Sequence, residues 1–335
     1  MSKVAKAAVG LMAATLVAKI LGFGRELALA SAYGASGVSD AFLVAMNIPA
    51  VIFTAIGTSL GTAFIPLYCE VNANKGEQGS NKFTNNVFNI VVIICIVLSV
   101  IGAIFTPQIV KMFAVGFEGE TLSLAIYYTR VMILGLAFLG MSYIMMAYLQ
   151  VKENFIIPGF MSVPYNILII ISIIVSVKIS PYLLPWGTLI GLSLQFLFQL
   201  PFAIKKGYRY KLYIDVKDEH LKRMLWLIAP VLIGVAVNQI NTIVDRTIAS
   251  TLVEGSISAL NYATKLNQFV MGMFIVSISS VVYPMLSKLS TENNKEKFNK
   301  SIITSVNTVT LLVIPISIGA IILANPIVKL LFQRG

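Results

Sequence analysis

Long apolar stretches separated by short polar segments run along the whole chain. Nine of them reach or approach the roughly 20 residues that a membrane-spanning helix requires; they cover residues 7–32, 39–67, 84–106, 121–149, 156–177, 183–204, 224–250, 258–286 and 303–331. A helix satisfies its own backbone hydrogen bonds in lipid, whereas an open sheet does not. The pattern therefore predicts an all-α polytopic membrane protein with about nine transmembrane helices.

The composition supports the membrane class. Of the 335 residues, 57% are hydrophobic and only 12% are charged, and the mean hydropathy is +0.86. Soluble domains carry about 25% charged residues. The composition therefore argues against a soluble protein of any function.

The polar segments indicate an orientation. With the N-terminus in the cytoplasm, sixteen of the 25 Lys and Arg residues lie in cytoplasmic segments and four lie outside. This asymmetry follows the positive-inside pattern of membrane proteins. Much of the net charge of +11 is thus explained by topology and by attraction to lipid headgroups. We expect membrane lipids as partners, and no nucleic acid.

Five cationic residues interrupt the apolar stretches: Lys19, Arg25, Arg130, Arg246 and Lys265. A charge at the bilayer centre costs at least about 2.5–3.5 kcal/mol, so such residues usually face a cavity or a charged partner. Arg130 lies near the outer end of its stretch, where it can snorkel to the interface, and is set aside. The membrane region also contains three acids, Glu26, Asp40 and Asp245. All five cations counted against these three acids give a net charge of +2, which suits a substrate with a diphosphate or carboxylate group.

Two helices carry polar residues at the spacing of one helical face. In the seventh stretch these are Asn238, Asn241, Thr242 and Asp245, and in the eighth Asn261, Thr264, Lys265 and Gln268. Such stripes predict a water-filled cavity, with interhelical hydrogen bonding as the alternative. On the first helix, Arg25 is rotated about 100° from Glu26. We therefore expect Arg25 to reach the ligand and Glu26 to pair with another cation.

The chain repeats itself weakly. A shift of 221 residues superposes three pairs of residues: Arg25 on Arg246, Gly34 on Gly255 and Asp40 on Asn261. Two halves of the same orientation are expected, as in parallel transporter repeats. We predict an N-terminal lobe at 1–204, a cytoplasmic linker at 205–223 and the start of a C-terminal lobe at 224–335. A second half of equal size would end near residue 426, so the chain is expected to be truncated.

The linker at 205–223 mixes basic and aromatic residues. This composition suits an interfacial helix on the cytoplasmic leaflet, and a solvated loop is the alternative.

The sequence offers no catalytic motif. It contains no phosphate-binding GxxxxGK[ST] loop, no HExxH, no nucleophile elbow and no zinc-ligand cluster. We therefore expect a transporter driven by an ion gradient or by the membrane potential, with no enzyme activity, no metal and no cofactor. A membrane-embedded enzyme or scaffold of envelope synthesis is the least favoured alternative, because the three intramembrane acids are spread over three helices.

Several segments together resemble one family. They are residues 7–49, GTAFIPLY, VNQINTIVDRTIASTLVEGSISALNYATKLNQF, SSVVYPMLSKLS and LLFQRG. From about residue 5 to its last residue the chain is similar to the MurJ (MviN) lipid II flippases of bacteria, within the multidrug/oligosaccharidyl-lipid/polysaccharide exporter superfamily. The resemblance implies a fourteen-helix, two-lobed protein of the bacterial plasma membrane that moves undecaprenyl-diphosphate-linked disaccharide-pentapeptide to the outer leaflet by alternating access. Export of another lipid-linked oligosaccharide or of drugs is the alternative, and we expect a monomer.

The resemblance also points to particular residues. Arg25 and Asp40 match family positions that line the central cavity. Lys19 and Lys265 stand where many members have Arg, and Glu26 stands where Asp is common. We expect the two lysines and Arg25 to bind the diphosphate.

The chain departs from the family in two places. Gln268 replaces an acid found in some members, and residues 47–53 lack an Arg pair that many members carry after the proline of helix 2. The family's last helices, which form a groove for the lipid tail, lie beyond the ninth, so we expect residues 1–335 alone not to flip lipid. The candidate substrate-binding residues are Lys19, Arg25, Lys265, Asp40, Glu26, Asn238, Asn241, Asp245, Arg246, Asn261 and Gln268.

Overall fold

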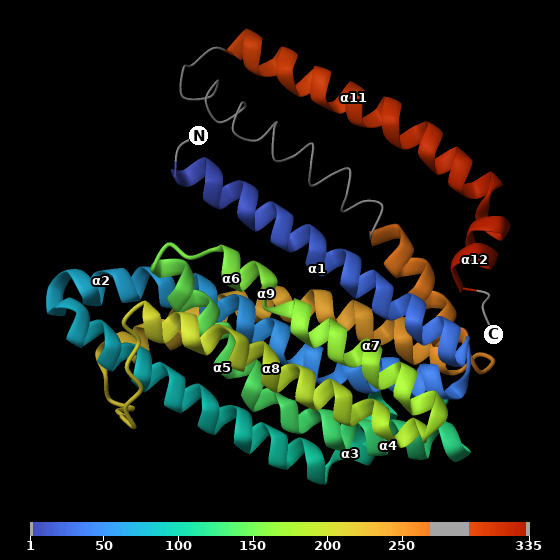
Figure 1. Ribbon diagram of the computed structural model, residues 1–335, viewed down its shortest axis with the longest axis horizontal. Helices are drawn as coiled ribbons and strands as arrows, with labels where there is room; N and C mark the ends of the chain where they lie inside the picture. Colours follow the sequence, from blue (N-terminus) through green and yellow to red (C-terminus); the bar gives the residue numbers. More distant parts are fainter. Residues whose placement is uncertain (1–2, 269–294, 333–335) are drawn as a thin grey trace. The chain divides into compact units, whose positions relative to one another are not determined.

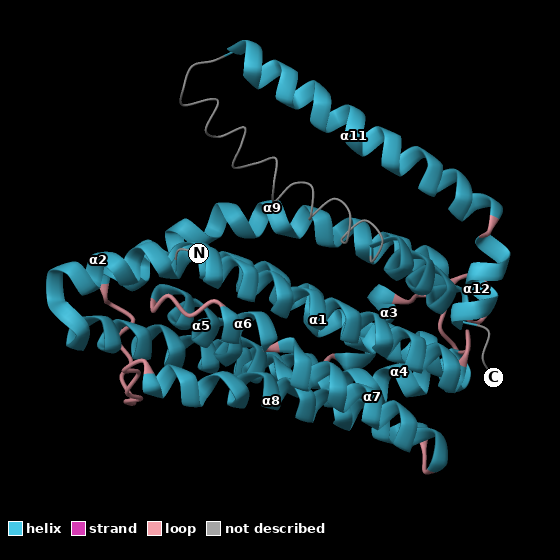
Figure 2. Cartoon of the chain, turned by 45° about the horizontal axis from the view of Figure 1, so that its top comes forward, coloured by secondary structure: helices cyan, strands magenta, loops and turns pink. Residues whose placement is uncertain are grey.

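The computed structural model describes residues 3–268 and 295–332 (Figure 1). Within these ranges every regular element is helical (Figure 2). The elements are α1 (Lys3–Tyr33), α2 (Gly37–Ile104), α3 (Thr106–Phe113), α4 (Gly119–Met132), the 3-10 helix η1 (Ile133–Gly135), α5 (Leu136–Val151), α6 (Ile156–Phe160), α7 (Ser162–Lys178), the 3-10 helix η2 (Pro181–Leu183), α8 (Leu184–Lys205), α9 (Glu219–Ser250), a helical stretch at 256–268, α11 (Lys295–Ile322) and α12 (Ala324–Phe332). The predicted all-α fold is confirmed.

Six segments of the described helices are long and apolar enough to cross a membrane. They are Leu60–Ile104, Gly119–Val151, Ile156–Lys178, Pro181–Lys205, Glu219–Ser250 and Lys297–Ile322. The beginning of α2, Gly37–Val51, is a shorter apolar helix. The predicted stretch at 258–286 falls partly outside the described residues. The helices therefore support a multi-pass membrane protein, and the count of nine spans stays a prediction.

Three predicted stretches have other boundaries in the structure. The second and third lie on the two helical arms of α2, which turn back on each other at Gly76 (Figure 1), where the backbone leaves the helical conformation; the φ of Gly76, 64°, lies in the left-handed region that favours glycine. The polar residues between these stretches thus extend two helical arms instead of forming a long loop. The last stretch, 303–331, is divided between α11 and α12, because Pro326 has no N–H to bond the carbonyl of Ile322.

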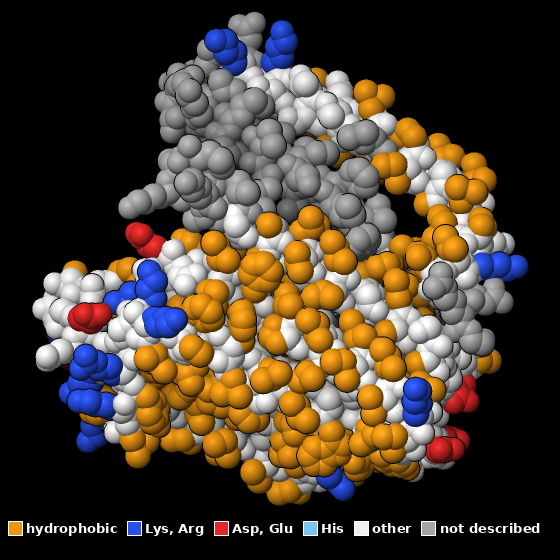
Figure 3. All heavy atoms as spheres, viewed as in Figure 1, with side chains coloured by type: hydrophobic (Ala, Val, Ile, Leu, Met, Phe, Trp, Pro, Cys, Tyr) orange, Lys and Arg blue, Asp and Glu red, His pale blue; other side chains and the backbone are white. Residues whose placement is uncertain are grey.

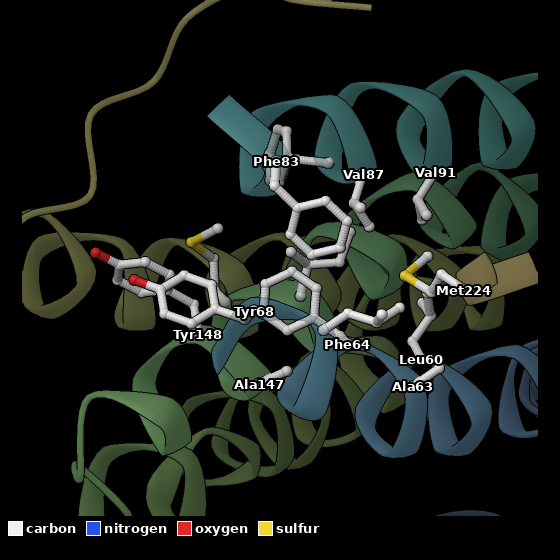
Figure 4. Packing of buried hydrophobic residues seen from close by; sticks show 14 of the residues in the cluster. Leu60, Ala63, Phe64, Tyr68, Phe83, Val87, Val91, Ala147, Tyr148 and Met224 are labelled. Carbon is white, nitrogen blue, oxygen red and sulfur yellow. The ribbon is translucent and has the colours of Figure 1, made fainter. Parts of the chain in front are cut away.

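Two apolar clusters pack the helices of residues 3–259. The first lies between the arms of α2, α5 and α8 and is rich in aromatic rings (Figure 4). In it Phe64 stacks on Phe83 with ring centroids 5.6 Å apart, and Tyr68 meets Tyr148 edge-on at 5.8 Å. The second cluster surrounds Phe42 and joins α1, the start of α2, α4 and α7. This cluster fixes the helices that carry the charged residues of the candidate site.

The surface is that of a membrane protein. Hydrophobic side chains dominate the middle of the face in Figure 3, and Lys, Arg, Asp and Glu gather toward its two ends. Val97 of α2, Ile174 of α7 and Ile190 of α8 are each about half exposed. So wide an apolar surface suits lipid rather than water.

The linker does not form the interfacial helix that its composition allowed. α8 ends at Lys205 and α9 begins at Glu219, and residues 206–218 are not helical. The physical reason is that asparagine side chains of α2 bind its backbone in an extended form, as in the bond from Asn85 to the carbonyl of Arg209 at 2.8 Å. Asp218 then begins α9 as its N-cap.

The chain divides into two compact units, Met1–Ala259 and Leu260–Gly335. The predicted lobes at 1–204 and 224–335 stay a prediction. In the second unit Tyr262 stacks on Phe332 with ring centroids 5.0 Å apart.

Candidate functional site

A buried ion pair lies on α1. Arg25 Nη2 is 2.6 Å from Glu26 Oε1, and Arg25 Nη1 donates a hydrogen bond to Asn166 Oδ1 of α7 at 3.3 Å. The Glu26 side chain is 2% exposed and that of Arg25 is 14% exposed. The guanidinium carbon also lies 6.0 Å from the ring centre of Tyr165. Although neighbouring residues point about 100° apart on a helix, the long Arg25 side chain reaches Glu26; the expected role of Arg25 toward the ligand stays a prediction.

Arg246, near the end of α9, joins the same cluster. Glu26 interacts electrostatically with Arg246, and Arg246 Nη1 donates to the carbonyl of Leu43 at 3.4 Å. The Glu26 carboxylate therefore forms an ion pair with Arg25 and acts electrostatically on Arg246, and the two arginines stand at the positions paired by the 221-residue shift. Two cations with one acid form a cluster suited to an anionic group.

Lys19 lines a hollow on the same helix, α1. The hollow has a volume of about 400 Å³ and is bounded by α1, α5, α6 and the start of α7. Lys19 is exposed, and Thr15 and Gln150 add polar groups to the wall. Six residues separate Lys19 from Arg25, which corresponds to about 9 Å along a helix. The hollow thus places a cation along the same helix as the buried ion pair.

Asp40, at the start of α2, accepts hydrogen bonds from residues that follow α9. One carboxylate oxygen accepts from Gly255 N at 2.8 Å, and the other accepts from Ser258 N at 2.7 Å and from the Ser258 hydroxyl. A carboxylate at the N-terminus of a helix is favourable because it binds amides that have no partner within the helix. Asp40 therefore joins α2 to the helical stretch that begins at residue 256.

More contacts surround this connection between α2 and the residues after α9, which we call the outer junction (residues 34–40, 112–121 and 247–258). Gly116 N donates to Ser250 Oγ at 3.1 Å, and Thr247 Oγ1 donates to the carbonyl of Met112 at 3.1 Å. A Cβ on Gly255 would lie 2.5 Å from the carbonyl oxygen of Ala35. Gly34 and Gly255, which the 221-residue shift pairs, both have positive φ, 59° and 90°.

The remaining candidates lie on α9 and on the stretch at 256–268. Asn241 and Asp245 are exposed on α9. The helical position of Asn238 is described on α9, and its side chain lies outside the described part of the structure. Asn261, Lys265 and Gln268 belong to the second unit, where they are buried, half-buried and exposed, respectively. Whether these residues share one cavity with Lys19 and Arg25 stays a prediction.

The structure also adds residues that the sequence did not single out. Asn166 and Tyr165 of α7 contact Arg25, and Ser258 contacts Asp40. An asparagine inside the apolar stretch 156–177 was a usable signal, whereas nothing local marked Ser258. Among the described residues, no group of three His, Cys, Asp or Glu side chains could hold a metal ion.

Known proteins of similar sequence form one family. A family model described as lipid II flippase MurJ matches residues 29–335. A probable lipid II flippase MurJ of Buchnera aphidicola subsp. Acyrthosiphon pisum is 30% identical over 96% of this chain and 64% of its own length. The lipid II flippase MurJ of Burkholderia cenocepacia is 28% identical over 96% of this chain and 64% of its own length. The chain thus spans just under two thirds of these curated relatives.

Solved structures agree with the sequence comparison. A lipid II flippase MurJ in an inward closed conformation superposes with a TM-score of 0.83 at 31% identity, covering 97% of this chain and 68% of the other. An inward-facing multidrug MATE transporter of the MOP superfamily has a TM-score of 0.70 at 14% identity, covering 93% of this chain and 72% of the other, and shares the fold. The chain therefore belongs to the MurJ family of multi-pass bacterial membrane proteins.

Proposed function

We propose that the protein is a lipid II flippase, which moves the undecaprenyl-diphosphate-linked peptidoglycan precursor from the inner to the outer leaflet of the plasma membrane by alternating access. The observation that carries this proposal is the buried cluster of Arg25, Glu26 and Arg246 on apolar helices. Intramembrane charges are costly and mark the paths of ions and charged substrates. The relatives' names add the substrate, lipid II.

Substrate binding would exchange the partners of Arg25. A diphosphate oxygen accepts hydrogen bonds from a guanidinium group as the Glu26 carboxylate does in this structure. Lys19 offers a compact charge at the hollow, about two turns of α1 toward the N-terminus. Lys265 would supply a third cation. The sugar-peptide headgroup would cross inside the cavity while the prenyl tail stays in lipid.

The orientation follows from the proposed cytoplasmic N-terminus. α1 then ends on the outer side at Tyr33, and α9 ends there at Ser250. The contacts of the outer junction would close this side, and the hollow lined by Lys19 would lie toward the cytoplasm. Rocking of the lobes to an outward-open state would break the bonds from Asp40 to Gly255 and Ser258.

Exposure of lipid II on the outer leaflet of flippase-depleted cells tests this function. The cells express the full gene product that contains this chain, either unchanged or with Arg25→Ala or Arg130→Ala. We expect the parent and Arg130→Ala to restore exposure and Arg25→Ala to lose it, because Arg130 is exposed and outside the cluster. No restoration by an inserted parent protein would overturn the proposal.

Export of another lipid-linked oligosaccharide or of drugs is the second candidate. The fold shared with multidrug MATE transporters supports it, whereas a cationic cluster disfavours cationic drugs. Efflux of a cationic dye by the parent, with no effect on lipid II exposure, would favour this candidate. We also propose that the protein is a monomer, which its mass in lipid nanodiscs would test.

A further inference from the structure

The linker is held against α2 by a ladder of asparagines. The donors, on the arm of α2 after Gly76, are Asn81, Asn85, Asn86 and Asn89. Their side-chain amides bind, at 2.8–3.2 Å, the carbonyls of alternate linker residues, namely Gly207, Arg209, Lys211, Tyr213 and Asp215. Binding of every second carbonyl fixes the linker in an extended form, in which successive side chains point to opposite sides.

Further hydrogen bonds run from the linker to the side-chain oxygens of these asparagines. Asn86 Oδ1 accepts from Asp215 N at 2.7 Å, and the hydroxyls of Tyr208 and Tyr210 donate to Asn85 and Asn89, each at 3.0 Å. The three asparagines involved are at most 5% exposed. The linker therefore buries these three asparagines of α2, and the same hydrogen bonds hold the linker in position.

The linker side chains alternate with this extended backbone. The even-numbered residues from 208 to 216 are all apolar or aromatic. Tyr208 is buried, whereas Tyr210, Leu212, Ile214 and Val216 are 57%, 77%, 47% and 66% exposed. Four exposed apolar side chains in ten residues are costly in water, which indicates that the linker meets an apolar phase.

The position of the ladder identifies that phase. Asn85, Asn89 and Ile93 follow one another at four-residue spacing, so each is turned about 40° from the one before around α2. Ile93 and Val97, 45% and 50% exposed, lie inside a segment apolar enough to span the membrane. The linker thus covers the polar residues that border a segment apolar enough to cross the lipid.

The charges identify the lipid. Five basic residues and one acid lie between 205 and 217. The single acid, Asp215, is engaged by the Tyr213 hydroxyl at 3.1 Å and by Lys217 N at 2.9 Å. Arg209 and Lys211 are exposed and alternate along the backbone with the apolar side chains. Basic residues flanking apolar ones at a membrane edge favour anionic headgroups.

We propose that residues 208–217 form a membrane-surface anchor. Leu212 and Ile214 insert at the boundary between headgroups and acyl chains of the cytoplasmic leaflet, and Arg209 and Lys211 bind the phosphates of anionic phospholipids. The assignment uses the proposed orientation of the chain but not the transport of lipid II. The anchor would keep the connection between the two lobes at the membrane surface.

Depth measurement tests the insertion. A nitroxide label is placed at Leu212→Cys, or at Lys75→Cys as an exposed control near the turn at Gly76, with Cys69→Ser and Cys95→Ala as background. The full protein is reconstituted in phosphatidylcholine vesicles that contain phosphatidylglycerol. We expect the label at 212 to be accessible to oxygen and shielded from a water-soluble nickel chelate, and the label at 75 to be accessible to the chelate. Equal chelate access at both positions would overturn the anchor and indicate a surface for water or for a soluble partner.

The charge role has its own comparison. Shielding of the label at 212 is measured in vesicles with and without phosphatidylglycerol, in the parent and in the double variant Arg209→Gln/Lys211→Gln. We expect phosphatidylglycerol to increase the shielding of the label in the parent and to have no effect on it in the double variant. The control is Lys297→Gln/Lys300→Gln, which changes two exposed residues of α11 and should behave as the parent does. A parent that does not respond to phosphatidylglycerol would refute headgroup binding, independently of any transport result.

The ladder gives a third check. Asn89→Ala removes the donor to two carbonyls, those of Lys211 and Tyr213. We expect the label at 212 to become more mobile in this variant, which its spectrum would show as narrower lines. An unchanged spectrum would show that the ladder does not hold the anchor.

Discussion

Replacement of Asp40 by asparagine tests whether one carboxylate holds the outer junction together. The Asp40 oxygens accept from Gly255 N at 2.8 Å, from Ser258 N at 2.7 Å and from the Ser258 hydroxyl. Asparagine has only one acceptor oxygen, so its NH₂ group would face one of these donors and leave it without a partner. A hydrogen bond to a charged group contributes about 1.5–3 kcal/mol. We therefore expect Asp40→Asn to lower the free energy of opening at the junction by about 2 kcal/mol.

Hydrogen exchange measures that opening locally. Because each 1.4 kcal/mol is a factor of ten, the amides of Gly255 and Ser258 should exchange about thirty times faster in Asp40→Asn than in the parent protein in nanodiscs. Asp245→Asn is the matched control, because Asp245 is an exposed acid of α9; its exchange at 255 and 258 should equal that of the parent. Unchanged protection in Asp40→Asn would refute the reasoning, since the two amides would then be held by something other than the carboxylate.

Two further predictions concern other ion pairs. Glu26→Gln should lower the free energy of unfolding by about 3 kcal/mol, because it leaves Arg25, whose side chain is 14% exposed, without its acid. Glu26→Asp, which keeps the charge, should lose less, and equal thermal stability of all three proteins would contradict the role of the pair. Outside the membrane, burial works against the charge of Lys152, but the hydrogen bond to Glu77 at 3.1 Å and the neighbouring Tyr68 together outweigh it and raise the pKa of Lys152 above its ordinary value of 10.5. Because the pKa is raised in the folded state, the pair of Lys152 and Glu77 should stabilise the protein at neutral pH, and this stabilisation should disappear as the pH rises past 10.5 and through the raised pKa. The difference in Tm between the parent and Lys152→Gln would show it. A difference in Tm that does not depend on pH would contradict the pairing.

The sequence predicted those features of the fold that depend on the local pattern of apolar and charged residues. Apolar stretches located most helices of the fold, and cations inside those stretches located Lys19, Arg25 and Arg246. The same pattern could not show that both arms of α2 stay helical up to Gly76, because polar residues outside the membrane form helices as readily as loops. It also could not show that Arg25 pairs with Glu26, since the angle between two positions on a helix ignores the length of an Arg side chain.

Contacts between distant segments were beyond the sequence. Asp40 meets Ser258 across 218 positions, and Asn85 meets the carbonyl of Arg209 across 124. No spacing rule links residues so far apart. The linker could therefore be described as helix or loop from its composition, but its extended form depends on asparagines in another part of the chain.

The outer junction has a further consequence for how such proteins change during evolution. Most of its bonds have a main-chain group at one end: the amides of Gly116, Gly255 and Ser258, and the carbonyl of Met112. A main-chain group survives almost any substitution, so position 112, whose side chain is 69% exposed, is free to vary while the bond from Thr247 persists. Sequence divergence at such positions is therefore a poor measure of whether two members of the family hold this end of the protein together in the same way.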